Sequence, residues 1–186
     1  MILPIYAYGQ PVLKKVGEEI TEDYPFLDEL LANMWETMYN AKGIGLAGPQ
    51  VGRSIRLFIV DSIQMEEEGE PFKGIKKVFI NPEKIEETGD VKPYEEGCLS
   101  IPDIRGDVNR PTTLTINYLD EKFQEHTETF DGLNARVIQH EYDHIDGVLF
   151  TELLKPLKRR MARRKLEKIK KGQIKEEYRM KFVTGR

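Results

Sequence analysis

Apolar side chains recur every three or four residues over residues 23–40, which is the spacing of one face of an α-helix. The recurring positions are Phe26, Leu27, Leu30, Leu31, Met34, Trp35 and Met38. Pro25 suits the first turn of this predicted helix, because proline lacks an N–H that the first turn leaves unpaired. We interpret the stripe of methionine and tryptophan as part of the core. The following stretch, Gly43–Gly52, contains too much glycine and proline to lie inside a helix.

Several short segments show the pattern of β-strands. Ile55–Val60 and Lys77–Ile80 are predicted strands, separated by an acidic loop at 66–70. Apolar and polar residues alternate along Thr112–Leu119, and after three polar residues a second alternating run continues to Phe130. These two runs predict an antiparallel hairpin.

Two further helices are predicted in the second half of the chain. Asp131–Gly132 ends the hairpin and begins a helix that continues to Asp146–Gly147. Val148–Leu154 is predicted as one more short strand, and Pro156 begins a C-terminal helix with only a thin apolar stripe. Strands in hairpins and helices segregated along the chain indicate an α+β fold. We expect antiparallel strands around the central helix, with the C-terminal helix added at the end.

Composition places the chain among ordinary globular proteins. It has 186 residues, of which 39% are hydrophobic, and no apolar run approaches the roughly 18 residues that a membrane span needs. The N-terminus has no basic region of the kind that begins a secretory signal. The single cysteine, Cys98, cannot form an internal disulfide, which favours a reducing compartment. We therefore expect a cytoplasmic monomer without a membrane partner.

The net charge of −4 conceals an uneven distribution. Residues 155–186 contain 14 Lys and Arg against 3 acidic residues, a net charge of +11. Residues 1–154 contain 14 basic and 29 acidic residues, a net charge of −15. We divide the chain accordingly into a body, 1–154, and an appended basic helix and tail, 155–186. Such a tail favours contact with a polyanion. The sequence leaves the order and the role of residues 172–186 open.

The strongest local signal for chemistry is the segment His140–His144 within the second predicted helix. His140 and His144 are four residues apart, so both imidazoles share one helix face and can bind one metal. Glu141 sits beside the first histidine, where its carboxylate can reach a water on that metal. The alternative is a helix with two hydrogen-bonded histidines and ordinary surface acids. The third histidine, His126, has no such neighbours, and we interpret it as an exposed strand residue.

A catalytic metal site usually has three protein ligands, so two histidines leave one to be found. Glu152 lies too close in sequence to be the third ligand of a zinc peptidase, and Glu167 lies within the basic tail. Cys98 is the better candidate, because Gly97 beside it permits a close approach of the backbone.

Three segments in the same order resemble the signature motifs of the peptide deformylase family. They are Gly43–Gln50 (GIGLAGPQ), Glu96–Ser100 (EGCLS) and Gln139–His144 (QHEYDH), and the resemblance covers residues 1–160. One departure is visible at position 48, which is glycine where this family commonly has alanine. The change touches no side chain with a chemical role.

The resemblance implies an amide hydrolase that removes the formyl group from the N-terminal formyl-methionine of new polypeptides. It implies Cys98, His140 and His144 as ligands of one divalent metal, which is Fe²⁺ in the cell, with Zn²⁺, Ni²⁺ or Co²⁺ as alternatives. A metal-bound water attacks the formyl carbon, and Glu141 acts as general base and then as general acid.

The resemblance also assigns the residues around that metal. Gln50 and the backbone N–H of Leu99 would face the oxyanion, while Gly45 and Ile44 would line the substrate channel. Glu96 and Arg110 look like the family's ion pair behind the ligands, with Glu96 a partner for His140.

Enzymes of this kind place their C-terminal helix on the ribosome near the tunnel exit, so we expect the basic helix 156–171 to bind there. Two other classes remain open at this point. A zincin-like metallopeptidase would use the His–Glu helix but would not need Cys98. A non-enzymatic RNA-binding module would explain the tail but would leave the metal ligands without a role.

Overall fold

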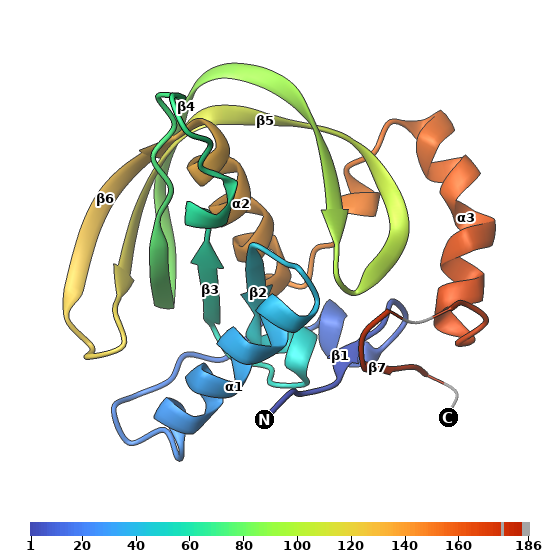
Figure 1. The fold of residues 1–186 in the computed structure, drawn as a ribbon, viewed down its shortest axis with the longest axis horizontal. Helices are drawn as coiled ribbons and strands as arrows, with labels where there is room; N and C mark the ends of the chain where they lie inside the picture. Colours follow the sequence, from blue (N-terminus) through green and yellow to red (C-terminus); the bar gives the residue numbers. More distant parts are fainter. Residues whose placement is uncertain (176, 184–186) are drawn as a thin grey trace.

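A central sheet with helices on both faces organises the molecule, which a computed structural model describes for residues 1–175 and 177–183 (Figure 1). The helices are α1 (Leu27–Asn40), α2 (Gly132–Ile145) and α3 (Pro156–Lys170). The strands are β1 (Ile5–Tyr6), β2 (Gly45–Ala47), β3 (Leu57–Asp61), β4 (Lys76–Cys98), β5 (Ile101–Leu119), β6 (Glu125–Asp131) and β7 (Met180–Lys181). Short 3₁₀ helices lie at Pro11–Lys14, Gly48–Val51, Ile63–Met65 and Phe150–Glu152. The arrangement confirms the predicted α+β class.

Strands β2 to β6 form an antiparallel sheet in which each strand pairs with the next along the chain. Strand β3 shows why both faces of this sheet are covered. Leu57 and Ile59 pack with α1 on one face, whereas Phe58 and Val60 pack with α2 on the other. Successive side chains of a strand point to opposite faces, so a strand between two helices is apolar at nearly every position.

A third apolar cluster joins the C-terminal helix to the far end of the β4–β5 hairpin. Ala162, Leu166 and Ile169 of α3 are buried there against Ile104 and Val108 of β5. In Figure 1 the long hairpin arches from the sheet, over α2, toward α3. The basic helix is therefore packed against the body through one narrow stripe. Across the described part of the chain, every helix is too short or too polar to cross a lipid bilayer.

The first helix starts later than its apolar pattern predicts. Phe26 has a left-handed backbone conformation with φ of 57°, so it cannot belong to the helix, and its carbonyl accepts the first helical hydrogen bond from Leu30. Pro25 consequently lies outside the first turn. Phe26 is 80% exposed, so its inclusion in the buried stripe was also wrong.

The strands β4 and β5 are much longer than predicted. Residues 85–95 of β4 are exposed, and the β4–β5 register shifts at four places. A strand that is exposed on both faces and interrupted by bulges loses the alternation that reveals strands in a sequence.

One other expectation was wrong. Val148–Leu154 is not a strand, because Phe150–Glu152 forms a 3₁₀ turn in which the Glu152 carboxylate accepts the Leu149 N–H. The order of the tail, which the sequence left open, is visible in its described part, where β7 pairs in parallel with β1. Residues 176 and 184–186 of that tail lie outside the described residues.

Candidate active site

Helix α2 and the end of β4 bring three predicted metal ligands together. His140 and His144 lie one turn apart on α2, with ring centroids separated by 5.0 Å. Cys98 approaches them from β4, and its Sγ lies 3.2 Å from Nε2 of His144. The donor atoms of the three residues all lie within 4.8 Å of one another. One thiol and two imidazoles at these separations fit a single zinc or iron ion, which binds such donors at about 2.0–2.3 Å.

The tight turn of the β4–β5 hairpin positions Cys98. Cys98 pairs with Ile101, so Leu99 and Ser100 form the turn between the strands. Gln50 lies beside this turn, and its Nε2 is 3.5 Å from Cys98 Sγ and 3.3 Å from Ser100 Oγ. Its Oε1 accepts the Ala47 N–H at 2.9 Å, which fixes the amide so that its N–H₂ faces the cysteine. The predicted site residues Gln50 and Leu99 are thus both adjacent to the metal ligands.

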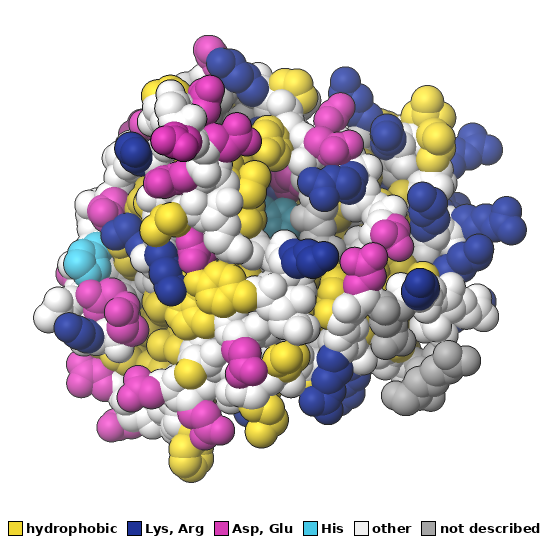
Figure 2. All heavy atoms as spheres, viewed as in Figure 1, with side chains coloured by type: hydrophobic (Ala, Val, Ile, Leu, Met, Phe, Trp, Pro, Cys, Tyr) yellow, Lys and Arg dark blue, Asp and Glu magenta, His cyan; other side chains and the backbone are white. Residues whose placement is uncertain are grey.

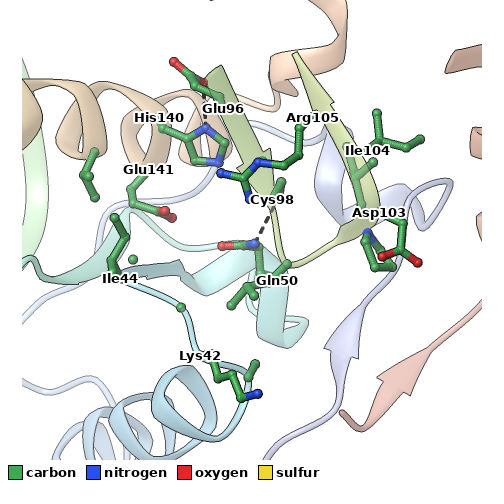
Figure 3. A pocket seen from close by; sticks show the side chains of 18 of the residues that line it. Lys42, Ile44, Gln50, Glu96, Cys98, Asp103, Ile104, Arg105, His140 and Glu141 are labelled. Atoms are coloured by element: carbon green, nitrogen blue, oxygen red, sulfur yellow. Dashed lines mark hydrogen bonds and ion pairs between the residues drawn. The ribbon is translucent and has the colours of Figure 1, made fainter. Parts of the chain in front are cut away.

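Glu141 is buried beside the histidines and packs directly against Gly45. A Cβ atom added at Gly45 would lie 2.4 Å from Glu141 Oε1, so only glycine fits at that position. The other carboxylate oxygen, Oε2, has no hydrogen-bond partner within the described structure although it is buried. A buried carboxylate oxygen without a partner is costly, which indicates a place for a water molecule or a ligand. In Figure 3, Glu141, Gln50, Cys98 and His140 converge on one space.

A buried ionic network holds His140 from behind. The Nδ1–H of His140 donates to Glu96 at 2.9 Å, so its Nε2 is left to face the cysteine. Arg110 donates twice to the same carboxylate, at 2.7 and 3.1 Å, and Arg136 donates once at 2.9 Å. Arg110 also binds Asp143 at 2.7 Å. The predicted pair of Glu96 and Arg110 is present, and it is part of a larger network.

Sequence reasoning missed Arg136 and Asp143. The position of Arg136 contained a usable signal, because it precedes His140 by four residues and so shares its helix face. Asp143 follows His140 by three residues and so shares that face as well, but its partner Arg110 comes from the distant strand β5 and could not be identified from a local pattern.

The surroundings shift the pKa values of these groups in opposite directions. Burial alone would raise the pKa of Glu96, but the hydrogen bonds from His140 and Arg110 outweigh it and hold that pKa far below its usual value. Burial raises the pKa of Glu141 to about 7, against the opposing effect of His140. Burial also lowers the pKa of His144, which keeps its imidazole neutral as metal binding requires.

A cavity of about 480 Å³ opens beside these groups. Ile44, Leu133 and Val137 give one part of its wall an apolar character, while Lys42, Asp103 and Arg105 bring charges to the cavity (Figure 3). The predicted substrate residues Ile44 and Gly45 both line it. The arrangement places three possible metal ligands, a buried carboxylate and an amide donor beside a partly apolar cavity wall.

His126 lies apart from this site, as predicted. It belongs to β6, where its Nε2 is 2.8 Å from Asp120 and its ring stacks on Tyr118. Its side chain is only partly exposed, at 38%, because of these two contacts.

A family model, sequence relatives and solved structures all point to the same family. The family model described as polypeptide deformylase matches residues 2–160. A peptide deformylase from Christiangramia forsetii is 54% identical over 100% of this chain and 98% of its own length. One from Salinibacter ruber is 47% identical over 96% of this chain and 93% of its own.

Solved structures agree with the sequence relatives. A peptide deformylase from Legionella pneumophila is 38% identical, with a TM-score of 0.81 over 95% of this chain and 99% of that one. The enzyme from Thermus thermophilus is 36% identical, with a TM-score of 0.81 over 92% of this chain and 99% of that one.

Proposed function

Because this chain belongs to the polypeptide deformylase family, we propose that it hydrolyses the formyl group from the N-terminal formyl-methionine of newly made polypeptides. Family membership makes it a metal-dependent hydrolase, which sets aside the zincin-like peptidase and the non-enzymatic RNA-binding module. The observation that carries the proposal is the meeting of Cys98, His140 and His144 with a buried glutamate at one cavity.

Cys98, His140 and His144 hold the metal in this proposal. The bound ion acts as a Lewis acid, which polarises the formyl carbonyl and makes water more acidic. We propose Fe²⁺ as the ion in the cell, with Zn²⁺, Ni²⁺ or Co²⁺ as ions that the same donors accept. The Glu96 network supports the role of His140 as a metal ligand, because it holds the imidazole in the tautomer that leaves Nε2 free to bind the ion.

Glu141 transfers the protons of the reaction. Its carboxylate takes a proton from the attacking water as the water oxygen bonds to the formyl carbon. It then gives that proton to the methionine nitrogen as the C–N bond breaks and formate leaves. The buried Oε2 without a partner and the pKa of about 7 support this role, because a proton carrier works best near the pH of the reaction.

Gln50 and the backbone N–H of Leu99 stabilise the oxyanion that forms during attack. The hydrogen bond from Ala47 holds the Gln50 amide before any substrate arrives, and such preorganised donors are each worth about 100-fold or more in rate. Gly45 allows the substrate to come close to Glu141. The methionine side chain occupies the apolar part of the cavity, at Ile44, Leu133 and Val137.

A formate-release assay tests the activity. We expect the protein, loaded anaerobically with Fe²⁺, to release formate from formyl-Met-Ala-Ser and to lose this activity when a chelator removes the metal. Met-Ala-Ser, which lacks the formyl group, is the control substrate, and a casein digest tests for cleavage of internal peptide bonds. No formate release from the metal-loaded enzyme would refute the function.

The basic side chains of α3 make the ribosome the proposed docking partner. Figure 2 shows the dark-blue side chains gathered over α3 and acidic ones spread over much of the remaining face. The basic residues of α3 lie on its exposed surface, and within the described structure none of the ion pairs includes them. A surface of unpaired cations suits the phosphates of ribosomal RNA. We further propose that the enzyme works in the cytoplasm as a monomer.

Substitution of Arg160, Arg163 and Arg164 by Gln tests this docking. We expect ribosome binding in a pelleting assay to weaken and to depend less steeply on salt, because three phosphate contacts are lost. Turnover of a short formyl peptide should stay unchanged. Truncation after Leu154 is a poorer test, because it also removes Leu166 and Ile169 from the third apolar cluster. Ribosome binding equal to wild type would refute α3 as the docking element.

A further inference from the structure

The chain returns to the catalytic cavity after α3. Residues 172–175 and 177–183, here called the return segment, begin at Gly172, which has a positive φ of 64°. Such a backbone turn suits glycine and lets the chain reverse direction at the end of a helix. Lys175, Tyr178 and Met180 of the return segment line the same cavity as Cys98.

Backbone pairing holds the return segment in place. In Figure 1, β7 lies beside β1. The N–H of Ile5 donates to the Arg179 carbonyl, and the N–H of Ala7 donates to the Lys181 carbonyl, each at 2.9 Å. Phe182 is then buried in the third apolar cluster. The segment is therefore a fixed part of the fold.

The Tyr178 hydroxyl bonds to the turn that carries the predicted oxyanion donor. It donates to the carbonyl oxygen of Leu99 at 2.6 Å. The next carbonyl, that of Ser100, accepts the backbone N–H of Tyr8 at 2.8 Å. Gln50 meets the same turn from the other side through the Ser100 hydroxyl. The two-residue turn is thus held by three separate elements of the chain.

We propose that Tyr178 is a positioning residue for deformylation, which holds Leu99 by its carbonyl and so keeps this residue, with the N–H on the other side of its Cα, aimed at the reacting carbonyl. This inference rests on the proposed function. Tyr178 acts through Leu99, because its hydroxyl is bonded to that carbonyl and to no other group in the described structure. The role makes the return segment a working part of the active site, in addition to its packing against β1.

The physical argument predicts an effect on turnover and little effect on substrate binding. The Leu99 carbonyl and the Leu99 N–H lie in two successive peptide groups that are joined at the Leu99 Cα. Tyr178 bonds to the turn at Leu99, whereas the other two contacts bond to it at Ser100, so loss of the Tyr178 hydroxyl gives Leu99 itself more freedom to shift. The Leu99 N–H then moves away from the position where the oxyanion forms, and catalysis by such donors depends on their alignment before reaction. Loss of one neutral hydrogen bond should lower the rate roughly 3- to 10-fold.

Tyr178→Phe tests the proposal because it removes the hydroxyl and keeps the ring in the cavity wall. We expect kcat per bound metal for formyl-Met-Ala-Ser to fall roughly 3- to 10-fold with KM unchanged. In the zinc-loaded enzyme, the amide NMR signals of Leu99 and Ser100 should shift. The matched control is Tyr6→Phe, which removes a hydroxyl bonded to the same segment through Lys181 Nζ at 3.1 Å. The control should keep wild-type kcat and unshifted signals at the turn.

The outcomes separate this inference from the function on which it rests. Absence of formate release by the wild-type enzyme refutes the proposed function itself. Wild-type turnover together with unchanged kcat in Tyr178→Phe refutes the positioning role alone. A fall that Tyr6→Phe reproduces, or a Tyr178→Phe protein that fails to fold, shows that the hydroxyl only stabilises the segment, and it also overturns the proposal.

Discussion

The two helices α2 and α3 have nearly the same length but place their charged side chains in different environments. Helix α2 has 14 residues, and of its charged side chains Arg136 and Glu141 are buried and Asp143 is half-buried. Helix α3 has 15 residues, and every one of its Lys and Arg side chains is exposed. Both helices are amphipathic, so periodicity alone does not distinguish them.

The difference comes from what covers each helix. Helix α2 packs on one face of the sheet, and the β4–β5 hairpin covers it from the other side (Figure 1). A charge in such a place must be paired, and the pairing fixes the direction of its neighbours. Helix α3 buries Ala162, Leu166 and Ile169 against the body, while its Lys and Arg side chains stay exposed to water. The buried charges of α2 therefore orient the side chains that they bind, whereas the exposed charges of α3 are available to a partner.

Removal of Cys98, the proposed metal ligand that β4 places beside α2, should have the largest effect. Cys98→Ala should lose bound metal and all measurable formate release, because two histidines alone do not complete the site. Elemental analysis of purified protein measures the metal, and circular dichroism confirms that the variant is folded. Metal content equal to wild type would remove Cys98 from the ligand set.

Glu141→Gln should have the next largest effect. The amide keeps the shape of the side chain but cannot take a proton, so kcat should fall about 100- to 10,000-fold. Metal content should stay at the wild-type value, since Glu141 is not a ligand. Turnover close to wild type with full metal occupancy would show that another group transfers the proton.

A smaller loss is expected from Glu96→Gln, which leaves the ligands in place but weakens their support. His140 and Arg110 lose their charged partner, so metal affinity should fall about 10- to 100-fold. The matched control is Glu95→Gln. Glu95 directly precedes Glu96 in β4, and its exposed carboxylate pairs with Arg105 at 3.3 Å. Titration with a competing chelator compares the two variants. If the Glu96→Gln and Glu95→Gln proteins bound metal equally well, the Glu96 carboxylate would have no role in supporting the ligands.

The metal centre was largely predictable from sequence, because its residues come in short motifs. His140 and His144 share a helix face by their spacing alone, and Glu96 and Cys98 lie in one five-residue motif. Arg136 and Asp143 could both have been found by the same spacing, whereas the pairing of Asp143 with Arg110 depended on where β5 passes over α2.

The return segment was not predictable for a different reason. Its high charge indicates disorder when only composition is considered, and its order comes from pairing with β1 at the opposite end of the chain. Tyr178 and Leu99 are 79 residues apart, and no local pattern connects them. The length of β4 escaped prediction for a local reason, since its exposed and bulged part lacks alternation.

Arg160→Glu should have the smallest effect, and its sign should be opposite to that of a change at α2. Arg160 lies three and four residues before Arg163 and Arg164, so the substitution replaces two repulsive pairs on an exposed face with attractive ones. Folding stability should rise by roughly 0.5–1 kcal/mol in urea denaturation, and the gain should shrink at high salt. Ribosome binding should weaken in the same variant. A gain in stability together with weaker ribosome binding would mean that the cations of α3 serve a partner and destabilise the fold. Unchanged stability and unchanged binding would mean that the charge of Arg160 contributes to neither.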